Sequence, residues 1–158
     1  MKPQRITTIA LAALIVAGCA SRPSSSTATA HEDTAMSNED TVRKFLNGFN
    51  DPSKIQESLD LLADDYRFKN PMVELHSKAE FIPLAQNIGA VLTGVELTRT
   101  AAHGEWVAAF YIFKSEIPGV QVNHATEWFR LEDGMIKESH LIYDASAWRK
   151  VYADMQTE

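Results

Sequence analysis

The hydrophobic positions of this chain repeat first with the period of a helix and later with that of a strand. One apolar stripe, with spacings of three and four residues, is formed by Val42, Phe45, Leu46 and Phe49. This stripe predicts a helix that ends near residues 48–50. Asp51-Pro52 then has the pattern of a helix start. The second predicted helix carries Ile55, Leu59 and Leu62 on its inner side and is closed by Asp64-Asp65.

A third helix is predicted after an extended stretch at residues 66–68 and a turn at Asn70-Pro71. Ser77 and Glu80 have the spacing of a capping box. The apolar positions that follow are Phe81, Leu84 and Ile88. Pro83 disagrees with a helix that begins at Ser77, because a proline beyond the first turn removes a backbone hydrogen bond. We therefore expect this helix to start late or to be kinked.

Four later segments, rich in β-branched and aromatic residues, predict long strands. They span residues 95–102, 106–115, 120–131 and 136–144, and an amphipathic helix follows at 147–155. Short turns at His103-Gly104, Pro118-Gly119 and Asp133-Gly134 separate the strands, which indicates an antiparallel meander. Helices followed by strands predict an α+β fold, with three helices packed on one face of a curved antiparallel sheet.

The N-terminal end has a different pattern. Lys2 and Arg5 precede an uncharged apolar run at residues 6–16, which is too short to span a membrane. Small residues then lead to Cys19, the only cysteine of the chain. This arrangement predicts a signal peptide at residues 1–18.

The residues Val16-Ala17-Gly18 before Cys19 resemble the lipobox of bacterial lipoproteins. The resemblance implies cleavage before Cys19 and lipid attachment to its thiol. Ala20 resembles the sorting pattern of Gram-negative lipoproteins, which implies the periplasmic side of the outer membrane. The alternative is an ordinary secretory signal with an incidental cysteine.

Composition divides the rest of the chain into a lipidated cysteine with a Ser/Thr/Ala-rich tether at residues 19–37 and a folded domain at 38–155. Without Lys2 and Arg5, 13 basic residues face 21 acidic ones, a net charge of −8. This balance argues against nucleic acid as a partner, because nucleic acid requires clustered Lys and Arg. The membrane contact is then made by the lipid on Cys19, and the folded domain has no thiol for a disulfide, a nucleophile or a metal.

The order of helices, turn and strands resembles the nuclear transport factor 2-like superfamily, in its SnoaL-like and ketosteroid-isomerase-like branch. The resemblance covers residues 38–145 and is carried by residues 42–50, 61–65, 70–71, 95–98 and 128–134. It implies a cone in which the helices close a strongly bent sheet around an apolar pocket. It also implies a homodimer that forms through the outer face of the sheet.

The resemblance argues against steroid isomerisation. The family's general base falls on Asn70, and an amide cannot take a proton from carbon near neutral pH. The family's oxyanion-binding tyrosine falls on Phe45. Glu127 stands where the family has a protonated aspartate. Of the three family residues (base, oxyanion-binding tyrosine and protonated acid), only the acid therefore has a counterpart in this chain.

Glu127 has apolar neighbours on its face of the strand, which suits either a pocket acid with a raised pKa or half of an ion pair. Two registers are open at the Asp133-Gly134 turn. A two-residue turn places Glu127 opposite His140. A Gly134 bulge, which the resemblance favours, places Glu127 opposite Ser139 and turns His140 to the outer face.

The predicted catalytic residues are Glu127 and, at the end of the last strand, Asp144, which could equally be a helix cap. The expected ligand-binding residues are Phe45, Tyr66, Asn70, Phe110, Phe129, Leu141 and Tyr143. A metal triad of His124, His140 and Glu127 is rejected, because strand alternation separates His124 from Glu127. We therefore expect neither a metal nor a cofactor.

Three functions are compatible with these patterns. The first is a membrane-anchored periplasmic lipoprotein that binds a small apolar ligand in its pocket. The second is a lyase, isomerase or cyclase that uses Glu127 as acid or base. The third is a dimeric interaction module with a vestigial pocket. The changed residues at Asn70 and Phe45 favour binding or interaction over catalysis.

Overall fold

The computed structural model describes residues 36–155. The predicted signal peptide, the predicted lipidation site Cys19 and most of the predicted tether lie outside the described residues. Within the described part, no helix is long and apolar enough to cross a membrane. The hydrophobic core and the side chains packed against it lie between Val42 and Val151, so the domain has a core of its own.

The helices of the described part are α1 (Asn38–Asn47), α2 (Ile55–Leu59), α3 (Lys78–Val91) and α4 (Ser146–Met155). Two 3-10 helices, η1 (Gly48–Asn50) and η2 (Pro52–Lys54), connect α1 to α2. Ser37 caps α1, since its Oγ accepts a hydrogen bond from the backbone N–H of Asp40 at 3.1 Å. The predicted apolar stripe of α1 is confirmed: Val42, Phe45 and Leu46 are buried.

The second helix is shorter than predicted. It ends at Leu59, and Leu62 is the first residue of β1 (Leu62–Lys69). The assignment of Leu62 to this helix and of Asp64-Asp65 to its end is therefore wrong. Leu62 is nevertheless fully buried, because it points inward from the strand. A buried strand residue can continue a helical spacing by coincidence when only a short turn separates the two elements.

The third helix begins at Lys78, directly after the capping box. The Oγ of Ser77 accepts from the N–H of Glu80 at 3.2 Å, and the Glu80 carboxylate accepts from the N–H of His76 at 2.7 Å. The expected late start is thus wrong, and Pro83 lies inside the helix. Pro83 and Ala79 are exposed, so water can bind the Ala79 carbonyl that the proline leaves without a donor.

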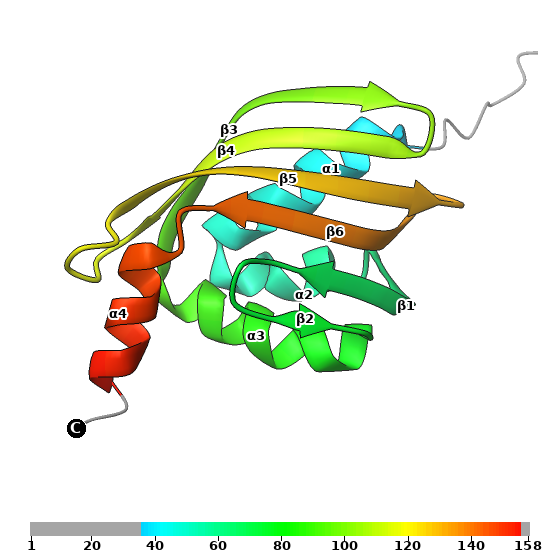
Figure 1. Cartoon of the computed structure of the whole chain (residues 1–158). Helices are drawn as coiled ribbons and strands as arrows, with labels where there is room; N and C mark the ends of the chain where they lie inside the picture. The colour runs from blue at the N-terminus through cyan, green and yellow to red at the C-terminus, as the bar shows by residue number, and fades with distance from the viewer. Residues whose placement is uncertain (1–35, 156–158) are drawn as a thin grey trace, which may run out of the picture. The chain divides into compact units, whose positions relative to one another are not determined.

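The sheet has six strands in the order β2-β1-β6-β5-β4-β3. The four long strands appear close to the predicted positions, as β3 (Leu92–His103), β4 (Trp106–Ser115), β5 (Val122–Glu132) and β6 (Met135–Tyr143). They form the predicted antiparallel meander. β1 pairs in parallel with β6, and β2 (Glu74–Leu75) adds a short edge. The fold is the predicted α+β arrangement, with the helices on one face of the curved sheet (Figure 1).

The β5–β6 hairpin has a register that neither sequence alternative contains. Asp133 and Gly134 both have positive φ, 50° and 75°, and form a two-residue turn between Glu132 and Met135. The register then shifts between Arg130 and Leu131, because β6 carries an extra residue after Ile136.

As a result Glu127 lies opposite Leu141, and not opposite His140 or Ser139. The bulge lets Ile136 and Ser139 both point inward, opposite Leu131 and Phe129. His140 pairs with Trp128 and is exposed, so its predicted place on the outer face is confirmed.

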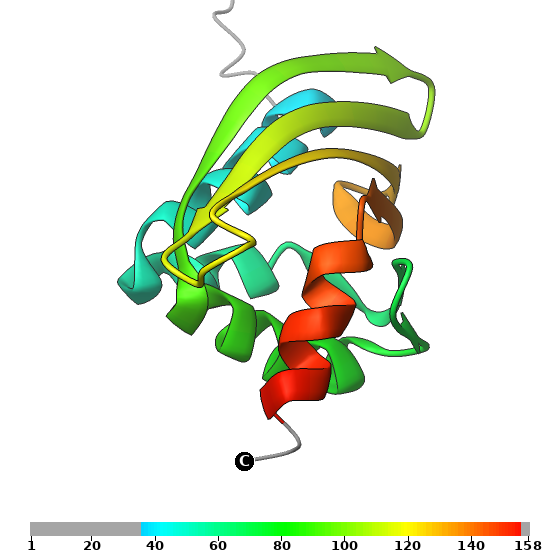
Figure 2. The same ribbon diagram turned by 60° about the vertical axis from the view of Figure 1, so that its left-hand side comes forward.

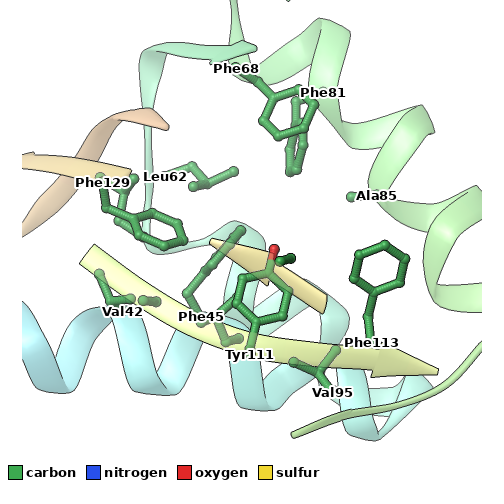
Figure 3. Close-up of a cluster of buried hydrophobic side chains, with 14 of the residues drawn as sticks. Val42, Phe45, Leu62, Phe68, Phe81, Ala85, Val95, Tyr111, Phe113 and Phe129 are labelled. Atoms are coloured by element: carbon green, nitrogen blue, oxygen red, sulfur yellow. The ribbon is translucent and has the colours of Figure 1, made fainter. Parts of the chain in front are cut away.

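The core fills the space between the helices and the concave side of the sheet. Figure 2 shows the long strands arching over the helices, and Figure 3 shows side chains from both layers converging. Phe45 of α1 packs edge-on against Phe129 of β5, with ring centroids 5.8 Å apart. Phe81 of α3 contacts both Tyr66 and Phe68 of β1. Aromatic contacts therefore join α1 to β5 and α3 to β1.

The outer face of the sheet is partly apolar. Its exposed large apolar side chains on β4, β5 and β6 are Trp106, Phe110, Val122, Trp128 and Ile142. Trp106 and Trp128 thus point away from the core, as strand alternation predicts. Thr126 lies between Phe110 and Ile142 in the register, and its buried hydroxyl has no hydrogen-bond partner among the described residues.

Candidate functional site

A cavity of about 740 Å³ lies between the concave side of the sheet and helices α1, α3 and α4. Its wall is largely apolar and aromatic. Phe45 lines it from α1 and Phe49 from η1. Phe81 and Ile88 line it from α3, and Trp148 from α4. Val73, Val91 and Tyr152 also line the cavity and are exposed, so they mark its opening to solvent. The volume is that of a site for a small organic molecule.

Among the described residues, Glu127 is the only carboxylic acid of this wall. Its side chain extends from β5 and is 4% exposed. The hydroxyl of Tyr111 on β4 donates to Oε2 at 2.7 Å, and the hydroxyl of Ser139 on β6 donates to Oε1 at 2.6 Å. Three neighbouring strands therefore meet at one carboxylate.

A second tyrosine extends this network away from the cavity. Tyr66 Oη on β1 lies 2.7 Å from Ser139 Oγ, and both residues are buried. A serine hydroxyl has a single proton, which Ser139 gives to Glu127, so Tyr66 is the donor in the bond to Ser139. All the hydroxyl protons of the network thus point toward the carboxylate.

The electrostatics of the network follow from burial. Burial raises the pKa of Glu127 from 4.5 to about 7, while the hydrogen bonds from Ser139 and Tyr111 act in the opposite direction. Burial and the nearby carboxylate raise the pKa of Tyr66 and of Tyr111 well above the ordinary value for tyrosine. Both phenols therefore remain protonated donors at neutral pH.

No protein cation compensates Glu127 within the described residues. Its carboxylate takes part in none of the ion pairs of this part of the chain. No Lys, Arg or His belongs to the described cavity wall. The hydroxyl groups alone stabilise the charged form, and for that reason the desolvation of the carboxylate dominates its pKa.

Asn70 lines the cavity where the family resemblance places the general base. Its Oδ1 accepts from the backbone N–H groups of Met72 at 2.7 Å and Val73 at 2.8 Å. These two bonds fix the orientation of the amide, because the oxygen must face the backbone donors. The NH₂ group of Asn70 remains as a possible donor to a ligand.

The predicted ligand-binding residues have different positions. Phe45, Asn70, Leu141 and Tyr143 line the cavity. Tyr66 lies behind Glu127 as the donor to Ser139, and Phe129 is fully buried in the core, so neither belongs to the cavity wall.

Phe110 does not line the cavity. Its side chain is 46% exposed on the outer face, so its assignment to the pocket is corrected. Alternation could have revealed this, because Phe110 has the same phase in β4 as Lys114, which must face water.

Asp144 is placed as a helix cap. It is exposed, and its Oδ1 accepts from the backbone N–H of Ser146 at the start of α4 at 2.9 Å. It does not line the cavity. Its pKa lies below the ordinary value because of the hydrogen bonds from Ser146. The structure therefore does not bring Asp144 and Glu127 into one acid–base pair.

Among the cavity residues that the sequence reasoning missed, Tyr111 and Trp148 matter most for the site. Tyr111 follows Phe110 directly, and the inward phase of β4, shared with Ala109 and Phe113, could have indicated it. Trp148 has no comparable signal, because its place depends on how α4 packs against the sheet. Its Nε1 donates to Asn123 Oδ1 at 2.8 Å, which fixes the indole in the wall.

Among the described residues, no group of three or more His, Cys, Asp or Glu side chains could hold a metal ion. The rejected triad is indeed dispersed, since His124 and His140 are exposed while Glu127 is buried.

The sequence pattern of the family described as SnoaL-like domain matches residues 42–139. The match covers more than half of the chain, so the chain belongs to this family. No curated protein matches the chain. The folded part of the chain is thus a SnoaL-like domain.

Solved structures with this fold include several bacterial proteins. A Kribbella flavida protein has a TM-score of 0.65 at 13% identity, with 75% of this chain and 96% of that chain covered. A nuclear transport factor 2-like protein of unknown function from Cytophaga hutchinsonii has a TM-score of 0.63 at 16% identity, with 76% and 98% covered. A Catenulispora acidiphila protein with a ketosteroid isomerase-like fold, in complex with trimethylamine, has a TM-score of 0.58 at 14% identity, with 68% and 88% covered. These identities establish the fold alone.

The buried carboxylate makes a prediction about stability and pH. Because the folded-state pKa of Glu127 is about 7 and its ordinary value is 4.5, the folded chain binds more protons than the unfolded chain between these values. The stability contribution of Glu127 is thus highest below pH 4.5 and is lost as the pH rises to 7. The Glu127→Gln variant has no titrating group at this position. Its free energy of unfolding, taken relative to that of the wild type, should therefore be about 3 kcal/mol higher at pH 8 than at pH 4.

Urea unfolding of both proteins at the two pH values measures this difference. Glu132→Gln, at the exposed end of the same strand, is the matched control and should change stability by less than about 0.5 kcal/mol. A difference between Glu127→Gln and wild type that stays constant with pH would contradict the burial of an ionisable Glu127.

Proposed function

We propose that this chain is a lipid-anchored lipoprotein on the periplasmic side of the outer membrane, whose SnoaL-like domain binds a small, predominantly apolar molecule. The observation that carries the binding function is the cavity of about 740 Å³, apolar over most of its wall, with one hydrogen-bonded carboxylate. Apolar walls supply affinity, and a few fixed polar groups orient a ligand. Glu127, the Asn70 amide and the Tyr143 hydroxyl are the orienting groups of this proposal.

Two positions argue against isomerase chemistry in this cavity. Asn70 uses its oxygen in a backbone turn and cannot act as a base. Phe45 offers no proton to a developing oxyanion. The family's base and its oxyanion donor are therefore both replaced in the described wall.

An enzyme of lyase, isomerase or cyclase type is the second candidate. The pKa of about 7 for Glu127 favours it, since such a group can both give and take a proton near neutral pH. The exposed position of Asp144 outside the cavity disfavours it. Recovery of a bound molecule unchanged after incubation with the chain supports binding, whereas its conversion supports catalysis.

The anchor is supported by the sequence alone. Residues 16–19 resemble a lipobox, and the Ser/Thr-rich residues up to 37 provide a hydrophilic spacer. The lipid holds the domain to the membrane, and the spacer keeps its cavity in the aqueous phase.

The outer face of the sheet supports a homodimer. Trp106, Phe110, Trp128 and Ile142 are exposed together on neighbouring strands. An apolar face of this kind can cover itself in a second copy through two-fold symmetry.

The binding proposal predicts that substitutions at two adjacent, leucine-sized residues of β6 have different effects on ligand affinity. Leu141 lines the cavity, whereas Ile142 is exposed on the outer face. Leu141→Trp should weaken the binding of the neutral fluorescent probe N-phenyl-1-naphthylamine about ten-fold or more, because the indole occupies the space that the probe needs. Ile142→Trp should leave the affinity unchanged.

Fluorescence titration of the chain from residue 20 onward, which contains the whole core, measures both effects. Circular dichroism checks that the variants are folded. Failure of the wild-type chain to bind the probe, or equal affinities of the two variants, would contradict a binding function of this cavity.

The lipoprotein proposal predicts the mature N-terminus. Mass spectrometry of the chain extracted from the membrane fraction should find Cys19 as the first residue, with acyl chains attached. Cys19→Ser should remove the acyl mass and leave the thermal unfolding of the domain unchanged, because Cys19 precedes the core. An N-terminus other than acylated Cys19 would overturn the anchor.

The dimer proposal predicts that Trp128→Asp yields a monomer, since a charge at the centre of an apolar interface is costly to bury. Trp128→Phe keeps an apolar ring at this position and should remain dimeric. Sedimentation of the chain from residue 20 onward tests both. A wild-type chain that is monomeric at concentrations on the order of tens of micromolar would refute this assembly.

A further inference from the structure

The aromatic side chains of the cavity form a continuous row from its opening to Glu127. Tyr152 at the exposed end contacts Trp148, with ring centroids 6.2 Å apart. Trp148 contacts Phe113 at 6.2 Å, and Phe113 contacts Tyr111 at 6.3 Å. Tyr111 is the residue that donates a hydrogen bond to Glu127. Aromatic faces attract organic cations, and the attraction increases when the cation has lost its water.

Both oxygens of Glu127 face a hydroxyl group, an arrangement that satisfies the hydrogen-bonding capacity of a carboxylate. Tyr111 and Ser139 each donate to one of its oxygens. The network is therefore arranged for the negative charge.

Among the described residues of the wall, no cation is paired with this negative charge. The titratable groups that face Glu127 are Tyr111 from β4, Tyr66 from β1 and, farther along the wall, Tyr143 from β6. The lining residues of α1, α3 and α4 include no charged side chain. Arg149 of α4 donates to the Pro71 carbonyl and is not part of the described wall. A buried carboxylate without a cation is strongly destabilising, and a cation supplied from outside would remove that cost.

We propose that the ligand of this cavity is a hydrophobic cation, an apolar molecule with one quaternary or protonated amine that lies against Glu127 and the neighbouring aromatic rings. The proposal rests on the proposed binding function and names the chemical class of its ligand. A neutral molecule with a hydrogen-bond acceptor is the alternative. Such a molecule could accept a hydrogen bond from the Asn70 amide or the Tyr143 hydroxyl, but it would leave the charge of an ionised Glu127 uncompensated.

Two molecules of nearly equal shape separate these alternatives. Benzyltrimethylammonium carries a permanent positive charge, and neopentylbenzene has a carbon atom in place of the nitrogen. Neither titrates, so any effect of pH on their binding comes from the protein. Both are tested by displacement of N-phenyl-1-naphthylamine from the chain that begins at residue 20.

At pH 8, benzyltrimethylammonium should bind about ten-fold or more tightly than neopentylbenzene, because it pairs with an ionised carboxylate and with aromatic faces. This preference should decrease as the pH falls through 7, where Glu127 takes up a proton. Glu127→Gln should bind both molecules with similar affinity. The pH series on the wild-type chain gives the same information if this variant does not fold.

A neopentylbenzene affinity equal to or above that of benzyltrimethylammonium at pH 8 would overturn the cation proposal and leave the binding function intact. Displacement by neither molecule, with the naphthylamine probe still bound, would also overturn it. If the probe itself does not bind, the proposed binding function fails, and the cation proposal fails with it.

Discussion

The carboxylate of Glu127 must find hydrogen-bond donors inside an apolar cavity, and three strands supply them. Tyr111 from β4 and Ser139 from β6 bind its two oxygens, and Tyr66 from β1 supports Ser139. These groups meet only because β1 pairs in parallel with β6 and because a bulge after Ile136 turns Ser139 inward. The site therefore depends on both the strand order and the bulge. A change of register by one residue would remove a hydrogen-bond donor and leave the buried charge of Glu127 unsatisfied.

The cavity follows from the bending of the same sheet. The long strands arch over the helices, and aromatic side chains from both layers cover the inner surface without filling it (Figures 2 and 3). α4 bounds the cavity with Trp148, whose indole nitrogen is bonded to Asn123 of β5. The polar groups are few, and Glu127, the Asn70 amide and the Trp148 indole are each held by hydrogen bonds. Such a site is suited to hold one molecule in one orientation, and its single acid gives it a defined electrostatic preference.

Much of this fold could be predicted from the sequence, because the signals were local. The α1 stripe, the Ser77 cap and the alternation of the four long strands depend on residues close in sequence. The prediction failed where two local signals pointed to different structures. Leu62 has the spacing of a helix residue but begins a strand, and Pro83 argued against a helix start at Ser77 that the structure nevertheless contains.

Within the site, the burial of Glu127 could be predicted from its apolar neighbours on the strand. The pairing of Glu127 could not, since the bulge in β6 is set by packing of Ile136 and Ser139 against β5 and β1, which no short sequence pattern records. The wrong assignment of Phe110 to the cavity was avoidable, because Lys114 indicates which residues of β4 face outward.

The central claim is that Glu127 is an ionisable acid buried in the cavity wall, with hydroxyl donors as its only partners among the described residues. A titration of its carboxyl-carbon chemical shift by nuclear magnetic resonance tests this claim most directly. The chain from residue 20 onward is used without ligand, and Glu127→Gln assigns the signal. The account predicts a midpoint near pH 7, the pKa that burial gives this group. A midpoint at or below the ordinary value of 4.5 would contradict it, because such a carboxylate would be either solvated or paired with a cation.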